Sequence, residues 1–226
     1  MSLKSKVVFR STLGLIVAAA ILFIPAGSLK YWQGWALLAL AFIPVLFFFP
    51  YLYKHDPQLL DRRMQGRENV REQKLIQVVG GLIFFPSSLL PGLDYRFGWS
   101  RTYLRPVPLW LTLLPLALVL GVLLYVAWVL KVNSFASRTI QVEAGQKVIS
   151  TGPYRMVRHP MYSGSLVMWL FTPLALGSYF ALPAFVLFIP FYVFRLLNEE
   201  KILRQELTGY PEYCLGTRFR LVPYVW

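Results

Sequence analysis

Long runs of apolar residues alternate with shorter polar, mostly basic stretches along the whole chain. The first four runs are Val7–Ala26, Tyr31–Tyr53, Leu75–Pro91 and Leu109–Leu130. Each has roughly the 17 to 25 residues with which a helix crosses the hydrocarbon core of a bilayer. Lys4, Lys6 and Arg10 precede the first run, as in a secretory signal peptide. A signal peptide has a shorter apolar run, so the sequence favours a retained span.

Two further apolar runs, Val167–Leu176 and Phe180–Leu197, are separated by Gly177 and Ser178. Glycine and serine favour turns, so these runs predict a tight helical hairpin that leaves and re-enters one side of the membrane. The pattern predicts an all-α, polytopic integral membrane protein with about six membrane segments, the last two forming the hairpin.

The polar segment 54–74 carries Arg62, Arg63, Arg67 and Arg71 at near-helical spacing, which predicts an interfacial helix. His55, at its start, reads as a solvated interface residue. Basic residues are also dense at the N-terminus, in 131–158 and in the C-terminal tail. The positive-inside rule therefore predicts that both termini are cytoplasmic, although Arg96, Arg101 and Arg105 fall on the other side.

Composition narrows the classes of partner. The chain has 226 residues, 57% of them hydrophobic, and a formal net charge of +13. Because the basic residues lie between apolar runs, anionic lipid headgroups explain them better than nucleic acid does. The single cysteine, Cys214, excludes an intramolecular disulfide and a CxxC zinc site, so no metal site is expected. Oligomeric state stays open.

The stretch Thr151–Gly164, TGPYRMVRHPMYSG, is the most informative polar segment. Gly152-Pro153 predicts a turn, and Pro160 suits the first turn of a helix. His159 is then next to a helix N-terminus, where free N–H groups favour an anion. A basic loop that anchors a helix at the lipid headgroups explains the same residues, and both interpretations stay open here.

RHPMYSG, preceded by TGPY and followed about 35 residues later by NEEKIL and then GYPEY, resembles the isoprenylcysteine carboxyl methyltransferases. The wider group includes the phospholipid N-methyltransferases. The resemblance covers Gln146–Pro223 and implies a methyltransferase-like region in 131–226. Hydropathy places transmembrane helices in 1–130 before it, and the loop charges place its site on the cytoplasmic side. The resemblance also implies S-adenosyl-L-methionine as the cofactor. The residues matching the family's cofactor pattern are Gln146, Lys147, Val148, Ile149, Tyr154, His159, Pro160 and Tyr162.

Arg195 and Glu199 follow the last apolar run and are spaced i, i+4, on one helix face. By resemblance they contact the methyl acceptor: Arg195 holds a carboxylate, and Glu199 orients Arg195 or the substrate. Without the resemblance, Arg195 also reads as a cation that snorkels at a helix end. Glu200 is expected to be a solvated neighbour. Met161 is assigned no chemical role, and Gly164 is expected to permit close packing.

The expected function is transfer of a methyl group to the carboxylate of an isoprenylcysteine-like or other lipid-associated acceptor. A phospholipid amine or a small thiol is an alternative acceptor, and Glu199 would then be the candidate base. An NADPH-dependent, sterol-type membrane reductase is a rival, because the C-terminal half of those enzymes resembles this family. A small transporter or scaffold would carry charges in the span centres, and the sequence shows almost none.

Overall fold

The computed structural model describes residues 2–64, 71–136, 142 and 145–226, with only the backbone described for 71–73. These residues form helices, turns and irregular backbone, with no β-strand among them. In chain order the elements are α1 (Leu3–Ala26), α2 (Trp32–Ile43), η1 (Pro44–Phe48), α3 (Phe49–His55), α4 (Pro57–Met64), α5 (Arg71–Phe97), η2 (Ser100–Leu104), α6 (Trp110–Val132), η3 (Gly152–Arg155), α7 (Pro160–Ala175), α8 (Leu182–Val186), α9 (Phe188–Glu206) and α10 (Tyr210–Gly216).

The prediction that the apolar runs form membrane-spanning helices is confirmed. Five helical stretches within the described residues are long and apolar enough to cross a membrane: Leu3–Ala26, Trp32–His55, Lys74–Phe97, Trp110–Val132 and Leu182–Glu206. The remaining predicted segment corresponds to α7, which is shorter, at 16 residues, and packs against α6. The chain is therefore an all-α, polytopic membrane protein of about six segments, as its hydropathy predicts.

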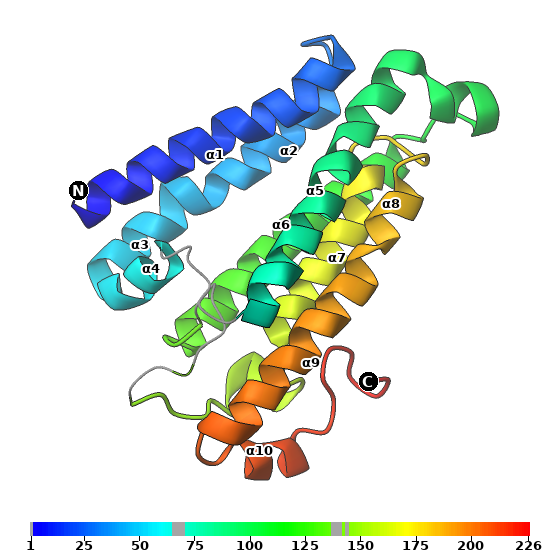
Figure 1. Ribbon diagram of the computed structural model, residues 1–226. Coiled ribbons are helices and arrows are strands. Elements are labelled where there is room, and N and C mark those ends of the chain that lie inside the picture. Colours follow the sequence, from blue (N-terminus) through cyan, green and yellow to red (C-terminus); the bar gives the residue numbers. More distant parts are fainter. Residues whose placement is uncertain (1, 65–70, 137–141, 143–144) are drawn as a thin grey trace.

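The helices form a bundle with one appended pair. Helices α1 and α2 lie side by side, and α5, α6, α7 and α9 run together next to them (Figure 1). Helix α10 and the C-terminus lie at the same end of the bundle as the last turns of α9 (Figure 1). That end also holds the segment between α6 and α7, so the sequence elements with candidate chemistry gather there.

Small residues set the closest helix approaches. A Cβ on Gly164 would lie 3.3–3.4 Å from Tyr125, Val122 and Val126, so the expected packing role of Gly164 in α7 against α6 is borne out. A Cβ on Gly80 would lie 2.5 Å from the Phe191 ring, which brings α5 against α9.

The third apolar run extends further than predicted. Helix α5 continues through Pro91 to Phe97, where the sequence indicated a connection from Gly92 onward. Neighbouring helices satisfy the backbone groups that a proline frees, so proline ends a helix less reliably in a membrane than in water. Asp94, on the extra turns, is 3% exposed, and its carboxylate accepts hydrogen bonds from the Ser100 N–H at 2.7 Å and the Ser178 hydroxyl at 2.5 Å. Asp94 lies near the end of its span, so it falls outside the expectation of almost no charge in the span centres.

The helices of the hairpin extend beyond its apolar runs. Helix α7 begins at Pro160, as the proline predicts, and α9 continues past Leu197 to Glu206. The shared helix face expected for Arg195 and Glu199 is therefore present. Because α9 is unbroken, Arg195, Glu199 and Glu200 have fixed positions relative to the membrane-spanning part.

Within the described part of the predicted interfacial segment 54–74, the helix between α3 and α5 is the short α4. Asp56 precedes it, and its carboxylate accepts from the Leu59 N–H at 2.9 Å, which satisfies one free donor at the helix start. Arg62 donates to the Ser134 carbonyl at 2.9 Å, so α4 docks on the segment after α6. Arg67 lies outside the described residues. His55 is exposed, as expected, and its ring contacts the Tyr51 carbonyl.

Candidate active site

A cavity of about 550 Å³ lies at the end of the bundle where α9 meets the segment between α6 and α7. Its volume falls in the roughly 300–1,000 Å³ range of small-molecule sites. All ten residues that the sequence singled out line this cavity: Gln146, Lys147, Val148, Ile149, Tyr154, His159, Pro160, Tyr162, Arg195 and Glu199. The structure thus brings together residues that are up to 53 positions apart, from the loop before η3 to α9.

Local sequence explains how His159 reaches the cavity. Gly152 has φ +57°, a conformation that glycine adopts without strain, and it starts the turn η3. Pro160 opens α7 with its fixed φ, which leaves His159 at the N-cap position. The His159 N–H donates to the Arg220 carbonyl at 3.0 Å, and its side chain is almost fully buried. The backbone hydrogen bond and the burial of the side chain together fix the position of the His159 ring.

Tyr154 forms a second fixed part of the wall. Its hydroxyl accepts from the Asn133 side-chain amide at 2.8 Å, and its carbonyl accepts from the Tyr213 hydroxyl at 2.6 Å. Burial raises the pKa of Tyr154 to about 12, and the Asn133 contact partly offsets that rise. The phenol is thus neutral at physiological pH and offers the cavity an aromatic surface.

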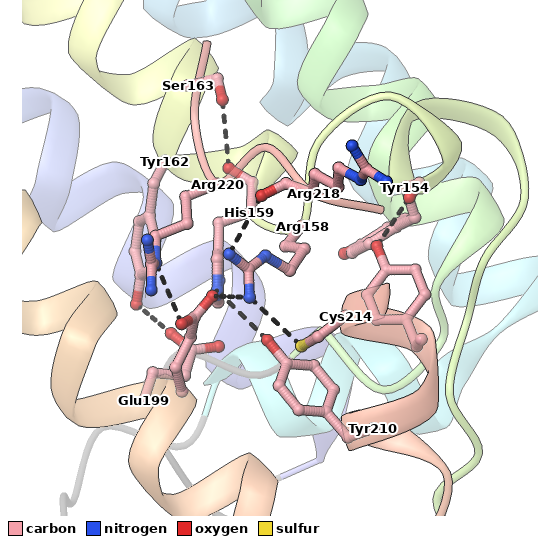
Figure 2. Close-up of polar contacts among 12 residues, drawn as sticks. Tyr154, Arg158, His159, Tyr162, Ser163, Glu199, Tyr210, Cys214, Arg218 and Arg220 are labelled. Carbon is pink, nitrogen blue, oxygen red and sulfur yellow. Dashed lines mark hydrogen bonds and ion pairs between the residues drawn. The ribbon is translucent and has the colours of Figure 1, made fainter. Parts of the chain in front are cut away.

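Tyr162 connects the two predicted acceptor residues. The Arg195 Nε–H donates to the Tyr162 hydroxyl at 3.1 Å, and that hydroxyl donates to Glu199 Oε2 at 2.5 Å. Figure 2 shows the Tyr162 and Glu199 side chains pointing toward each other. Hydrogen bonds to charged groups are shorter and stronger than neutral ones. The first turn of α7 and the middle of α9 are therefore joined by a charge-assisted chain at the cavity.

The expectation that Glu200 is a solvated neighbour is wrong. Glu200 is 4% exposed, and its carboxylate forms ion pairs with Arg158 at 3.0 Å and Arg220 at 3.0 Å. Its Oε1 also lies 3.4 Å from His159 Nε2. Successive residues on a helix point about 100° apart, so Glu199 faces the cavity while Glu200 faces the C-terminal tail.

The C-terminal tail forms a backing layer behind His159. The Arg158 N–H donates to the Phe219 carbonyl at 2.9 Å, and the Ser163 hydroxyl donates to the Leu221 carbonyl at 2.6 Å. Figure 2 shows Arg218 and Arg220 on this segment beside Arg158 and His159. The tail is thus part of the site's support, which the sequence motifs did not indicate.

Sequence reasoning also missed several cavity residues. Tyr210 and Tyr213 line the cavity from α10, and Arg63 and Gln77 line it from α4 and α5. The Tyr210 hydroxyl lies 3.4 Å from His159 Nε2, and burial raises the pKa of Tyr210. GYPEY was part of the recognised pattern, and its two tyrosines were the available signal. Arg63 and Gln77 had no motif to mark them.

Comparison with known proteins was consistent with this geometry. Residues 109–208 match the family described as phospholipid methyltransferase. The Delta(14)-sterol reductase TM7SF2 of Mus musculus is 34% identical over 91 residues, which are 39% of this chain and 22% of the reductase. The chain thus matches only about a fifth of that relative's length. The residues matched to the phospholipid methyltransferase family carry α6, α7 and α9, so this similarity covers a little under half of the chain and agrees with the group that the motifs resemble.

Proposed function

We propose that the protein is a membrane-embedded methyltransferase that uses S-adenosyl-L-methionine and methylates the carboxylate of an isoprenylcysteine-like or other lipid-associated acceptor. The observation that carries this proposal is that His159, Tyr162 and the Arg195–Glu199 pair line one cavity at the end of a membrane-spanning helix. The family match supports the reaction type.

The residues of the cavity fit a methionine–nucleoside ligand. Gln146, Lys147 and His159 supply polar or cationic groups that suit a carboxylate. Val148, Ile149 and Tyr154 supply aliphatic and aromatic surface that suits a purine. We assign this part of the cavity to the cofactor. When bound, the cofactor supplies a methyl group on a sulfonium.

We assign the α9 side of the cavity to the acceptor. Phe191 and Tyr192 line the cavity one turn before Arg195, in the apolar first half of α9. A lipid tail can lie along this apolar surface while its head group meets the Arg195 guanidinium. A guanidinium binds a carboxylate with two parallel hydrogen bonds, which fixes the orientation of the attacking oxygen.

The protein has little acid–base work to do for a carboxylate acceptor, which is already ionised at neutral pH. Tyr162 holds the Arg195 and Glu199 side chains in register, which aligns the acceptor oxygen for the transfer. Methyl transfer from a sulfonium to a carboxylate forms an ester and removes both charges. An amine or thiol acceptor would need to lose a proton, and Glu199 would be the base.

The acceptor can be identified by direct assay. Purified protein would be incubated with methyl-labelled S-adenosyl-L-methionine and, in separate reactions, with a farnesylated cysteine acid, phosphatidylethanolamine or a small apolar thiol. The proposal predicts base-labile methyl ester on the farnesylated acid. Label on the amine or the thiol, with none on the acid, would reject the carboxylate acceptor and keep the methyltransferase.

A second candidate function is an NADPH-dependent membrane reductase, because a sterol reductase matches part of this chain. The two candidates differ in the nucleotide they bind. We expect S-adenosylhomocysteine to raise the thermal denaturation midpoint of the detergent-solubilised protein and NADPH to leave it unchanged. The opposite pattern would replace the methyltransferase with the reductase.

We also propose that the cavity opens to the cytoplasm, based on the basic residues near that end of the bundle. Ser150 is exposed near the cavity, and Lys30 is exposed in the α1–α2 connection. In a Cys214→Ser background, a cysteine at Ser150 should react with an impermeant thiol reagent from the cytoplasmic side and one at Lys30 from the other side. Reaction of both from one side would reject this arrangement.

A further inference from the structure

A buried carboxylate lies behind the cavity wall and takes no part in the chemistry proposed above. The Glu200 side chain is 5% exposed, and its two oxygens contact different partners. Oε1 pairs with Arg158 NH1 at 3.0 Å and lies 3.4 Å from His159 Nε2, whereas Oε2 pairs with Arg220 Nε at 3.0 Å. Arg158 and His159 line the cavity.

The group around Glu200 has a defined charge balance. It contains two guanidinium groups, one carboxylate and an imidazole, and Arg158 is as buried as Glu200. The Arg158 guanidinium also donates to the Cys214 sulfur at 3.2 Å and the Arg218 carbonyl at 3.2 Å, neither of which is a charged partner. Glu200 therefore supplies the negative charge that offsets these cations.

The balance matters for a cationic ligand. Electrostatic interactions act over longer distances in a buried, low-dielectric site than in water. Arg63, Lys147, Arg158 and Arg195 place four positive charges along the cavity, against the one carboxylate of Glu199 in its described lining. Loss of the Glu200 charge would leave Arg158 and Arg220 without their carboxylate partner beside His159, and a ligand with a sulfonium would be repelled.

We propose that Glu200 is a positioning residue that holds His159 and Arg158 in the cavity wall and, through its charge, sets the preference of the site for a sulfonium over a neutral thioether. This inference rests on the proposed function, because it assumes that the cavity binds S-adenosyl-L-methionine. It assigns Glu200 a role separate from that of Glu199, which faces the cavity itself.

Two ligands test the charge directly. S-adenosyl-L-methionine and S-adenosylhomocysteine differ by one methyl group and the sulfonium charge, so the ratio of their dissociation constants isolates the electrostatic effect. Calorimetry on Glu200→Gln protein should show affinity for the sulfonium falling on the order of tenfold more than affinity for the thioether. A purely structural role would weaken both ligands by the same factor and would leave the ratio unchanged.

A second variant keeps the test informative if Glu200→Gln does not fold. Arg220→Gln removes a partly exposed cation from the same group and leaves the Glu200–Arg158 pair in place. We expect the ratio of dissociation constants to shift in the opposite direction, toward the sulfonium. The shift should be smaller than in Glu200→Gln, because solvent screens the exposed arginine. A shift toward the thioether, or none, would overturn the inference.

Matched controls come from the same elements. Glu206 ends α9 with an exposed carboxylate, and the Arg218 side chain is exposed two residues before Arg220. Glu206→Gln and Arg218→Gln should leave the ratio at the wild-type value. A shift in Glu206→Gln equal to that in Glu200→Gln, or in Arg218→Gln equal to that in Arg220→Gln, would show that net charge alone sets the ratio and would overturn the inference. Failure of the wild-type protein to bind either ligand would instead reject the proposed function.

Discussion

The Tyr162 hydroxyl donates a hydrogen bond to Glu199 Oε2 at 2.5 Å and accepts one from Arg195 Nε at 3.1 Å. Tyr162 belongs to RHPMYSG, and the other two residues lie on α9 more than 30 positions later. One phenol thus couples the segment assigned to the cofactor with the pair assigned to the acceptor. The relative position of the two ligands depends on this contact, which gives the first prediction.

Tyr162→Phe removes this hydroxyl and keeps the ring. We expect turnover to fall about tenfold or more, because loss of a hydrogen bond to a charged group costs roughly 1.5–3 kcal/mol. Affinity for S-adenosylhomocysteine should change by less than the turnover, as measured by calorimetry on the same preparation. Full turnover in this variant would show that the contact does not align the acceptor residues.

Arg195→Lys keeps a positive charge and removes the planar guanidinium. A lysine has no Nε–H for Tyr162 and binds a carboxylate as a point charge, so we expect a loss of about 10- to 150-fold in turnover. Cofactor affinity should be retained. Initial rates with labelled cofactor measure this effect, and a fully active variant would make Arg195 a snorkelling helix-end cation.

The pH profile separates the acceptor classes. A carboxylate acceptor has an ordinary pKa near 4, so it stays ionised and the rate should not fall between pH 8 and pH 6. A larger fraction of an amine or thiol is protonated, and so unreactive, as the pH decreases, so its methylation should slow over the same interval. Rates at saturating cofactor would show which holds, and a steep fall toward pH 6 would contradict the carboxylate assignment.

Gly92→Ala tests the packing of α1 on α5. A Cβ on Gly92 would lie 2.8 Å from the Leu22 carbonyl oxygen and 3.0 Å from Pro25 Cβ, and these atoms cannot move without shifting α1. Overpacking of this kind costs about 1–3 kcal/mol, so the thermal midpoint in detergent should decrease. Gly81→Ala, on the same helix with no atom within 4 Å of the added Cβ, is the matched control and should not lower it.

Hydropathy predicted the membrane segments, and the resemblance of the motifs to a family predicted ten of the residues that line the cavity, because both depend on local sequence order. The choice between Glu199 and Glu200 could not be made in this way. The two are adjacent, and which of them is buried depends on where the C-terminal tail crosses α9, which is a tertiary contact. Helix α5 continues past Pro91 because neighbouring helices and the Ser178 hydroxyl, which donates to Asp94, stabilise the additional turns. These contacts also come from distant parts of the chain.

Arg63 and Gln77 are two cavity residues that the sequence could not indicate, again because their position depends on tertiary contacts. They lie in the N-terminal part, outside residues 109–208, and face the cavity only because α4 and α5 fold against α6 and α9. A motif that spans the C-terminal part carries no information about these helices.

The most direct test of the central proposal is calorimetry with S-adenosylhomocysteine on wild-type, His159→Ala and His55→Ala proteins. The chain has two histidines: His159 is buried in the cavity wall, and His55 is exposed at the end of α3. We expect one site in the wild type, a substantially weaker one in His159→Ala, and unchanged affinity in His55→Ala. Absence of binding to the wild type, or equal affinity in all three proteins, would contradict the assignment of this cavity to the methyl donor.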